Sequence, residues 1–507
     1  MNFTRLHEPF DATRAQRPAA VFIREPGRTL TYAELGALVD MLAAELRDDG
    51  VRAGDRVLIV AENCPEHVAL ILACSRVGAW SCGVNARMAA GEVAAFLAKA
   101  DARIAYFTAA VSTAAAAHAQ RHGARASVLP GLQRSAVFEH ALAETGALGA
   151  QVAAVIFTSG TTGVPKGVMV SHDGLLHFAR VSAHSRALGP QDRSYAYLPM
   201  THVFGLATVL MASLVAGAGL VMRSQFAAGD VLDALANHQV SILQGPPTLF
   251  SRLLAHLDAH GIAAPPCPQL RYLYTGAGPL DLALKLQVEA RFGQPLHHGY
   301  GLSEYAGSLY VTRQHEWRAD TSAGYPVEGA ELRIVDAAGN DLPALARGEI
   351  WIRGRGLMAG YFRDPQATRE AMRPGGWYAS GDLGERAADG ALFVVGRLKE
   401  MIIRSGFNVY PGEVEALLNT WPAIHRSAVV GQREADGNEQ VLAYVVLRDG
   451  QTLDREALAT FVRDRLAPYK RPAQVQVVAE FPMTDSGKVF KRRLVELFPP
   501  EMPPPRV

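Results

Sequence analysis

Between residues 219 and 292, short apolar runs alternate with amphipathic stretches, and this alternation limits the possible fold more than any other feature of the chain. The runs have the length of buried strands and occupy 219–222, 240–243 and 271–275. Stretches with helical periodicity follow them at 230–238, 247–260 and 280–292. Strands joined by helical crossovers form parallel sheets with helices on both faces. We therefore predict an α/β fold, and apolar runs at 56–61, 104–108 and 152–157 extend it toward the N-terminus.

A chain of 507 residues is too long for one ordinary hydrophobic core, so we expect two or more domains. Residues 325–396 change to short alternating runs between Gly, Asp and Pro turns, which indicates a small β-rich subdomain. A helix at 413–418 and strands at 428–430 and 441–447 indicate a small α+β domain after it.

The charges of the chain nearly balance. The net charge is +1, without a long run of like charge, and this argues against nucleic acid as a partner. The first residues lack the apolar core of a signal peptide. The cysteines form no C-x-x-C pair and suit reduced thiols in a cytoplasmic protein; they are Cys64, Cys74, Cys82 and Cys267.

Residues 203–222 carry no charge over about twenty positions, which is the length of a membrane-spanning helix. Gly205, Gly217 and Gly219 interrupt this run, and its last four residues have the character of a strand. We therefore predict a buried helix followed by a strand, and no stable membrane insertion.

Residues 157–172 hold the motif that says most about function, Phe-Thr-Ser-Gly-Thr-Thr-Gly-Val-Pro-Lys-Gly-Val-Met-Val-Ser-His. Glycines let backbone N–H groups approach an anion, and hydroxyls and a lysine add donors and charge. The order differs from the nucleoside-triphosphatase loop, because Lys166 follows Gly163 too closely and is itself followed by Gly. A flexible surface loop is the alternative. We predict a phosphate-binding loop made by Thr158, Ser159, Gly160, Thr161, Thr162, Gly163 and Lys166.

Two further glycine motifs lie near expected strand ends. Gly-Ala-Gly-Pro-Leu (276–280) follows a strand and opens a helix, which is where open α/β sheets bind ligands. In His-Gly-Tyr-Gly-Leu-Ser-Glu (298–304), Tyr300 offers a flat face and Glu304 a hard oxygen of the kind that binds Mg²⁺. The alternatives are a packing turn and a tight turn with a solvated glutamate.

Three motifs follow toward the C-terminus. Residues 377–383 supply Asp382, which can accept both hydroxyls of a ribose or can belong to an ordinary turn. Residues 396–402 supply Arg397 and Lys399, and alone they read as a charged linker. Residues 482–493 place Lys488 after a glycine turn, and the basic residues 491–493 read as a solvated run.

Together these motifs resemble the adenylate-forming superfamily of acyl-CoA synthetases, luciferases and the adenylation domains of peptide synthetases. Matching segments occur in the right order over nearly the whole chain. The resemblance implies a large N-terminal domain, residues 1–397, with parallel αβ subdomains and a β-rich subdomain. A small mobile α+β C-terminal domain, residues 398–507, would carry the catalytic lysine. It also implies ATP, Mg²⁺ and coenzyme A as cofactors.

The resemblance also assigns roles. Tyr300 would stack on adenine, Glu304 would meet Mg²⁺, and Lys488 would reach the reacting carboxylate and α-phosphate. Lys399 would be the hinge between two poses of the C-terminal domain. The remaining ATP-binding residues would be the phosphate loop with Gly276, Ala277, Gly278, His298, Gly299, Gly301, Ser303, Asp382 and Arg397. The chain departs from the family at Ser303, where Thr is usual, at His298, where an amide is common, and at Ala379 and Ser380, which replace a basic residue and Thr.

Residues 198–206 supply His202, and a lone histidine is more often structural than functional. The resemblance places it beside the acyl carboxylate, with Val203, Gly278 and Gly301 lining the substrate. No aspartate occurs at 198–207 to hold an α-ammonium group, and no arginine follows to hold a second carboxylate. An apolar monocarboxylic acid, aromatic or medium-chain aliphatic, is therefore expected. Gly406 and Arg471 would contact coenzyme A.

We therefore expect an enzyme that converts a carboxylic acid to acyl-AMP and then to acyl-CoA, as a monomer or homodimer, with Lys488, Glu304 and His202 as its catalytic residues. Three alternatives remain open. They are a ligase that loads an acyl carrier protein, a luciferase-like oxygenase and a non-catalytic nucleotide-binding module.

Overall fold

The computed structural model describes residues 3–158, 166–404, 407–433, 438–483 and 489–499. The chain forms two compact units. The first comprises Met1–Leu332 with Ile352–Tyr378, and the second comprises Arg333–Trp351 with Ala379–Val507. The predicted domain boundary at residue 397 marks where one domain would rotate relative to the other. A division into compact units does not test such a rotation, so this boundary stays a prediction.

A nine-stranded sheet is the largest element of the first unit, in the order β16-β15-β14-β13-β12-β10-β11-β1-β2. Six neighbouring strands of this sheet are parallel, namely β14, β13, β12, β10, β11 and β1. The strands β2, β15 and β16 add antiparallel edges. The bounds are β1 (Val21–Glu25), β2 (Arg28–Thr31), β10 (Arg193–Ala196), β11 (Gly219–Met222), β12 (Ile242–Gly245), β13 (Tyr272–Thr275), β14 (Leu296–Leu302), β15 (Gly307–Val311) and β16 (Tyr325–Pro326).

A second sheet of seven strands has the order β6-β7-β5-β3-β4-β8-β9. The strands β3, β4, β5 and β8 are parallel, and β9 pairs antiparallel with β8. The bounds are β3 (Arg56–Ala61), β4 (Trp80–Asn85), β5 (Ile104–Phe107), β6 (Arg125–Ala126), β7 (Gln133–Arg134), β8 (Val152–Thr158) and β9 (Lys166–Ser171). The predicted parallel αβ architecture is confirmed.

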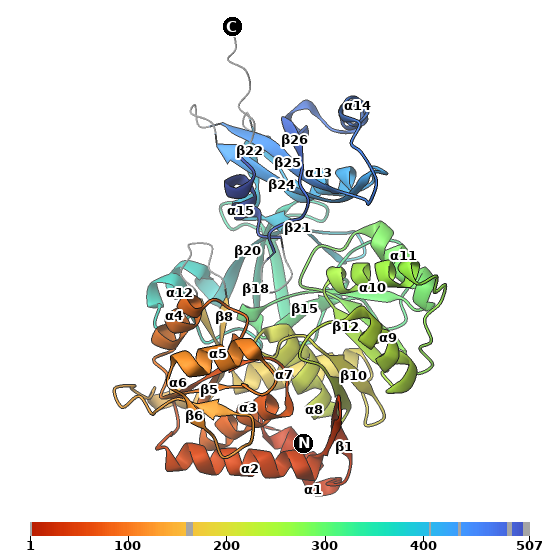
Figure 1. Cartoon of the computed structure of the whole chain (residues 1–507). Coiled ribbons are helices and arrows are strands. Elements are labelled where there is room, and N and C mark those ends of the chain that lie inside the picture. Colours follow the sequence, from red (N-terminus) through yellow and green to blue (C-terminus); the bar gives the residue numbers. More distant parts are fainter. Residues whose placement is uncertain (1–2, 159–165, 405–406, 434–437, 484–488, 500–507) are drawn as a thin grey trace. The chain divides into compact units, whose positions relative to one another are not determined.

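Helices connect these strands, and the labels in Figure 1 locate them. Local signals fix their ends: Thr31 and Glu34 form a capping box at the start of α2, and Gly78 ends α3 in the left-handed conformation. The bounds are α1 (Glu8–Gln16), α2 (Tyr32–Asp48), α3 (Pro65–Val77), α4 (Ala90–Ala100), α5 (Thr113–Arg121), α6 (Gly146–Gln151), α7 (His172–Ser185), α8 (Ala212–Ala216), α9 (Ala228–Asn237), α10 (Pro247–Ala259), α11 (Leu282–Phe292) and α12 (Pro365–Ala371).

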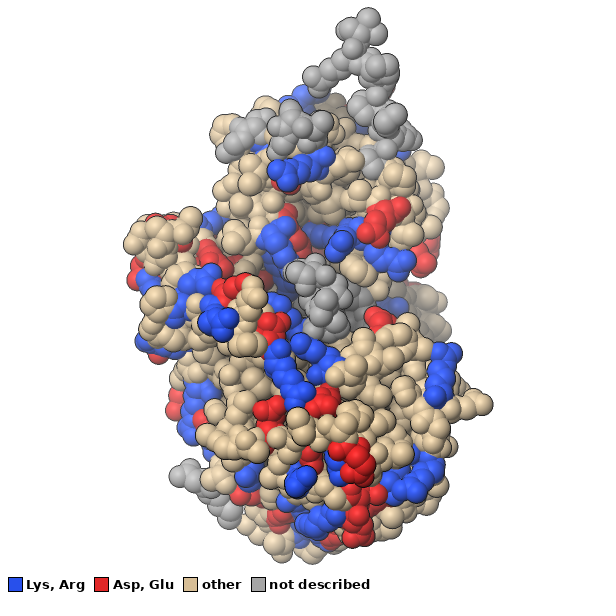
Figure 2. Space-filling view, turned by 90° about the vertical axis from the view of Figure 1, so that its left-hand side faces the viewer, with Lys and Arg blue, Asp and Glu red and all other residues tan. Residues whose placement is uncertain are grey.

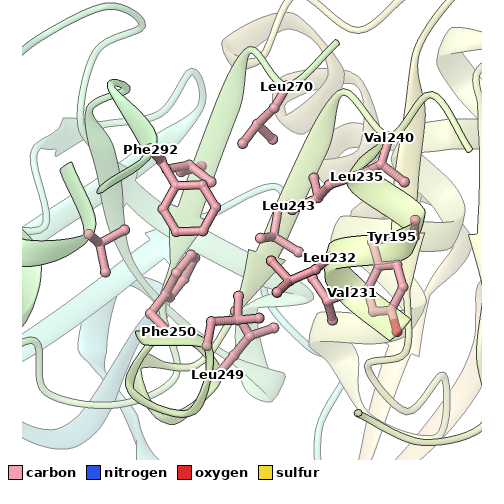
Figure 3. Packing of buried hydrophobic residues seen from close by; sticks show 14 of the residues in the cluster. Tyr195, Val231, Leu232, Leu235, Val240, Leu243, Leu249, Phe250, Leu270 and Phe292 are labelled. Carbon is pink, nitrogen blue, oxygen red and sulfur yellow. The ribbon is translucent and has the colours of Figure 1, made fainter. Parts of the chain in front are cut away.

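Figure 3 shows how the nine-stranded sheet is covered. Val231 and Leu235, one turn apart on α9, and Leu249 and Phe250 of α10 belong to one buried cluster with Leu243 of β12. Burying each such side chain stabilises the fold by about 1.5–3 kcal/mol. This packing fixes the carboxyl ends of β12 and β13, where the glycine turn at 276–278 begins.

The uncharged run at 203–222 is a buried helix followed by strand β11, as predicted. Its first part is a π-helix, Phe204–Met211, which continues into α8. Among the described residues, no helix combines the length and the apolar character that crossing a membrane requires.

The second unit contains the small α+β fold predicted near the C-terminus. Strands β24 (Ile424–Arg433), β25 (Glu439–Leu447) and β26 (Gln474–Val477) form a sheet, β22 (Ile402–Arg404) and β23 (Phe407–Val409) form a hairpin, and the helices are α13 (Pro411–Leu418), α14 (Arg455–Arg465) and α15 (Lys491–Leu497).

The predicted β-rich segment is the sheet of β17 (Ala330–Val335), β18 (Gly348–Gly354), β19 (Met372–Arg373), β20 (Trp377–Arg386) and β21 (Leu392–Arg397). The predicted fold class is confirmed.

Basic and acidic side chains are interspersed on the face drawn in Figure 2. This agrees with the net charge of +1. Cys64, Cys74 and Cys82 are buried, Cys267 is partly exposed, and all four are free thiols.

Candidate active site

The phosphate motif joins two antiparallel strands. Thr158 at the end of β8 is the register partner of Lys166 at the start of β9. Thr158 Oγ1 lies 3.5 Å from the Lys166 carbonyl oxygen, toward which it donates. The predicted loop residues Ser159, Gly160, Thr161, Thr162 and Gly163 lie outside the described residues, so their phosphate-binding role stays a prediction.

The free edge of β9 is covered by residues 358–362, which come from a distant part of the chain. The N–H of Met169 donates to Gly360 over 3.0 Å, and the N–H of Phe362 donates to Gly167 over 2.7 Å. This pairing places the Tyr361 ring beside Lys166, whose Nζ lies 4.7 Å from the ring centre. The ammonium group of Lys166 therefore lies against an aromatic face.

Tyr361 also contacts Glu304. Its hydroxyl donates to Glu304 Oε1 over 3.0 Å and lies 3.1 Å from the hydroxyl of Tyr378. Both tyrosines are only 5% exposed. Burial, with the nearby Glu304 carboxylate, raises the pKa of both phenols well above its ordinary value, so both keep their protons at neutral pH.

Glu304 lies in a 3₁₀ turn, Ser303–Tyr305, directly after β14. The sequence suggested that the motif beginning at residue 298 follows the end of a strand. Residues 298–302 instead lie inside β14. The strand pairs parallel with β13 through His298 and antiparallel with β15 from Gly299 onward. The expected strand end is thus a change of partner within one strand.

Glu304 provides the donor chemistry that Mg²⁺ needs. Among the described residues, no three His, Cys, Asp or Glu side chains gather into a metal cage. Mg²⁺ that arrives with nucleotide phosphates needs only one or two protein carboxylates and keeps several waters. A single half-buried carboxylate therefore fits such an ion.

The turn at 276–278 lies beside this motif, because Thr275 at the end of β13 is the register partner of His298. Ala277 has φ of 63°, in the left-handed region, where a residue with a Cβ is strained by about 1–2 kcal/mol. The His298 ring is hydrogen-bonded at Nδ1 to the carbonyl oxygen of Thr321 over 3.0 Å. Burial lowers the pKa of His298, which favours the neutral ring.

The acyl segment, residues 198–206, contacts strand β13 just before this turn through aromatic rings. Phe204 at the start of the π-helix packs edge-on against Tyr274, with ring centres 5.8 Å apart. Two residues earlier, His202 Nδ1 accepts the N–H of Phe204 over 3.2 Å, so a neutral His202 carries its proton on Nε2. Val203 is buried.

Tyr274 fills the space behind the glycines of both motifs. Its hydroxyl is hydrogen-bonded to Ser308 Oγ over 3.0 Å. A Cβ at Gly299 would come within 2.4 Å of that hydroxyl, so the strand approaches the ring this closely only because residue 299 is glycine. Tyr274 was not identified from the sequence.

In the second unit, Asp382 and Arg397 come together. They are register partners on β20 and β21, and Arg397 Nε lies 3.2 Å from Asp382 Oδ1. The Asp382 N–H donates to Ser380 Oγ over 3.1 Å. The two residues assigned to the ribose are therefore neighbours. Lys399 lies just beyond, in a 3₁₀ turn, Leu398–Glu400, with an exposed side chain.

The remaining predicted residues lie near the end of the chain. Gly406 and Lys488 are outside the described residues. Arg471 donates from Nε and Nη2 to the carbonyl oxygens of Leu466 and Arg463 at the end of α14, so part of its guanidinium has a structural task. Its contact with coenzyme A stays a prediction.

The prediction that Lys491 belongs to a solvated basic run is wrong. Its Nζ lies 2.7 Å from Glu415 Oε1 and 3.5 Å from Glu400 Oε2, and its side chain is 21% exposed. Burial alone would lower the pKa of Lys491, but the two carboxylates outweigh it and raise that pKa. The spacing of the basic residues contained no sign of these partners.

Comparison with known proteins gives the class of protein to which this fold and site belong, the adenylate-forming enzymes. The family model described as AMP-binding enzyme matches residues 10–362, and the model described as AMP-binding enzyme C-terminal domain matches residues 413–488. The chain belongs to the AMP-binding enzyme family. The expected enzyme class, an AMP-forming acid–thiol ligase, is confirmed at this level.

Relatives match almost the full chain. A feruloyl-CoA synthase of an Amycolatopsis species is 34% identical over 475 residues, which cover 94% of this chain and 95% of that protein. An indoleacetate–CoA ligase of Aromatoleum aromaticum is 34% identical, with 96% of each chain covered. The crystal structure of ATP-bound MatB from Rhodopseudomonas palustris superposes with a TM-score of 0.87 at 29% identity, covering 98% of this chain and 99% of that one.

Proposed function

We propose that the protein activates an apolar monocarboxylic acid, aromatic or medium-chain aliphatic, as its acyl-AMP and transfers the acyl group to coenzyme A. AMP and pyrophosphate would be the other products. The observation that carries this proposal is the aromatic wall of Phe204 and Tyr274 next to His202. The names of the feruloyl-CoA synthase and indoleacetate–CoA ligase relatives favour the aromatic option.

The chemistry explains why such residues are needed. A carboxylate is a poor electrophile, and adenylation gives it AMP as a leaving group. In the first half-reaction, the carboxylate oxygen attacks the α-phosphorus of ATP, and the bond to pyrophosphate breaks. Negative charge gathers on the phosphate oxygens, so catalysis depends on positioning and positive charge.

Each residue then has a proposed part. Lys166 and the phosphate loop would hold the β- and γ-phosphates, and Lys488 would contact the reacting oxygens. Tyr300 would stack on adenine, and Asp382 with Arg397 would bind the ribose. Glu304 would hold Mg²⁺, which when bound neutralises phosphate charge.

In the second half-reaction, the thiol of coenzyme A attacks the acyl carbon, and AMP leaves. A rotation at Lys399 would remove Lys488 and bring Gly406 and Arg471 to the thiol path. His202 would line the site of the carboxylate with Val203, Gly278 and Gly301. A cytoplasmic location and a monomeric or homodimeric state are part of the same proposal.

A screen of pyrophosphate release tests the function. We expect release with cinnamic, phenylacetic or indoleacetic acids, or with hexanoate and octanoate, and formation of the matching CoA thioester. The panel includes malonate, because a buried cation, Arg186, lies 4.6 Å from the Tyr274 ring and could attract a second carboxylate. It also includes α-amino acids as a second class of charged substrate. Preference for either of these by kcat/KM would contradict the proposed substrate class.

The same assay separates the other functions. Faster transfer to a holo acyl carrier protein than to coenzyme A would favour a carrier-loading ligase, and light emission would favour an oxygenase. A folded protein that binds ATP but releases no pyrophosphate with any acid would be a binding module.

A further inference from the structure

We propose that Tyr361 is a positioning residue that sets the metal-binding carboxylate and the phosphate-loop lysine relative to each other. Its hydroxyl donates a hydrogen bond to Glu304, and its ring contacts the ammonium group of Lys166. The inference rests on the proposed roles of these two residues and adds a third residue on which both depend.

The backbone of Tyr361 is held from two sides. Its N–H donates to Thr368 Oγ1 of α12 over 2.9 Å, and Tyr361 forms a β-bridge with Val168 of β9. The Met358 N–H donates to the carbonyl oxygen of Glu304 over 2.8 Å, which joins the same segment to the Glu304 turn. The ring therefore has little freedom to move away from either neighbour.

The direction of the hydrogen bonds follows from the number of protons. Tyr361 has one hydroxyl proton, and it is donated to the Glu304 carboxylate. The bond between the two tyrosines must therefore be donated by Tyr378. The hydrogen-bonded series therefore runs from Tyr378 through Tyr361 to Glu304.

This series of hydrogen bonds fixes one carboxylate oxygen of Glu304 and leaves acceptor capacity on the carboxylate for a cation. Partners that orient a metal ligand in this way typically change metal affinity or activity by about 10–100-fold when they are removed. The ring of Tyr361 acts separately, because an ammonium group over an aromatic face is attracted by the ring quadrupole.

Four variants divide these contributions. Tyr361→Phe removes only the hydroxyl, and Tyr361→Leu also removes the ring. Tyr378→Phe removes the donor behind Tyr361. Tyr305→Phe is the matched control, because Tyr305 is also buried and adjoins Glu304, yet its hydroxyl donates to the carbonyl oxygen of Gly329 over 3.1 Å.

The measurement is Mn²⁺ binding, followed by electron paramagnetic resonance, with α,β-methylene-ATP as the nucleotide. We expect Tyr361→Phe to weaken Mn²⁺ binding about 10-fold and Tyr378→Phe to weaken it less. Tyr305→Phe should stay within about twofold of the wild type. With EDTA present, Tyr361→Phe should bind the nucleotide normally, whereas Tyr361→Leu should bind it more weakly through the loss of the Lys166 contact.

The inference is overturned if Tyr361→Phe binds Mn²⁺ like the wild type, or if Tyr305→Phe shows the same loss. It is also overturned if Glu304→Gln leaves Mn²⁺ binding unchanged, since the carboxylate would then not be the ligand. Pyrophosphate release by the wild type is judged separately. An active wild type with an unchanged Tyr361→Phe variant rejects only this inference, whereas a wild type inactive with every acid rejects the proposed function.

Discussion

Lys166 is the described residue of the phosphate loop whose removal most directly tests the ATP site. Its ammonium group rests on the Tyr361 ring, and its side chain is partly exposed, so it contributes little to the core. We expect Lys166→Ala to lower kcat/KM for ATP on the order of 10²-fold, as when a preorganised charge is removed. Thermal unfolding should change little.

Lys99→Ala on α4 is the control for that variant, because Lys99 is also a partly exposed lysine of the first unit. Unchanged ATP kinetics in a folded Lys166→Ala protein would reject the phosphate-loop assignment. The comparison is made by steady-state pyrophosphate release and differential scanning calorimetry.

At the residue scale, sequence reasoning paired some functional side chains and missed others. Asp382 and Arg397 were both selected, and they meet on adjacent strands. Tyr361 and Tyr378 were not selected, because their importance arises from contacts between segments far apart in the chain. In the folded chain, the pairing of 358–362 with β9 places Tyr361 beside Lys166, and the hydroxyl of Tyr361 donates to Glu304.

At the scale of elements, β4 and the acyl segment pack with almost no space between them. A Cβ at Gly83 would lie 2.9 Å from the Cα of Thr201, next to His202. On the other side, Asn63 donates to the Leu198 carbonyl over 2.8 Å and accepts the Met200 N–H over 3.0 Å. The position of His202 therefore depends on the fit of these neighbours.

We expect Gly83→Val to destabilise the protein by about 1–3 kcal/mol through overpacking and to raise KM for the acid more than KM for ATP. The control is Gly91→Ala on α4, where a Cβ would meet nothing within 4 Å. That variant should be neutral or slightly stabilised. Equal changes in both KM values for Gly83→Val would mean that this contact does not position the acyl site.

Element types were predictable from periodicity, and their details were not. Strand β11 lies where its apolar run predicted, whereas β12 begins at Ile242, two residues later than predicted. Just before β12, the hydroxyl of Ser241 donates to Asp192, and its carbonyl accepts the N–H of Arg271. The π-helical turn at Phe204 also has no signature in the apolar pattern.

At the scale of the whole molecule, two residues should divide the reaction into halves. Lys488→Ala should lose adenylate formation by on the order of 10²-fold, because a charge at the transition state is removed. Given synthetic acyl-AMP and coenzyme A, the same variant should form thioester at nearly the wild-type rate. Separate assays of the two half-reactions measure this.

Lys399→Pro should have the opposite effect, since proline fixes φ near −65° and restricts the second pose. Adenylation should survive, and thioester formation should fall. Lys399→Ala is the control, because it removes the charge but leaves the backbone free. Equal loss of both half-reactions in Lys488→Ala and Lys399→Pro would contradict the two-pose mechanism.

The cover over β9 also has a consequence for biosynthesis. Strand β9 ends its sheet, and residues 358–362 close that edge although they are translated long after it. Chains begin to fold from the N-terminus while they are still being synthesised, and open strand edges favour intermolecular pairing. The nascent chain therefore exposes an aggregation-prone edge on the ribosome until the segment that carries Tyr361 emerges and closes it.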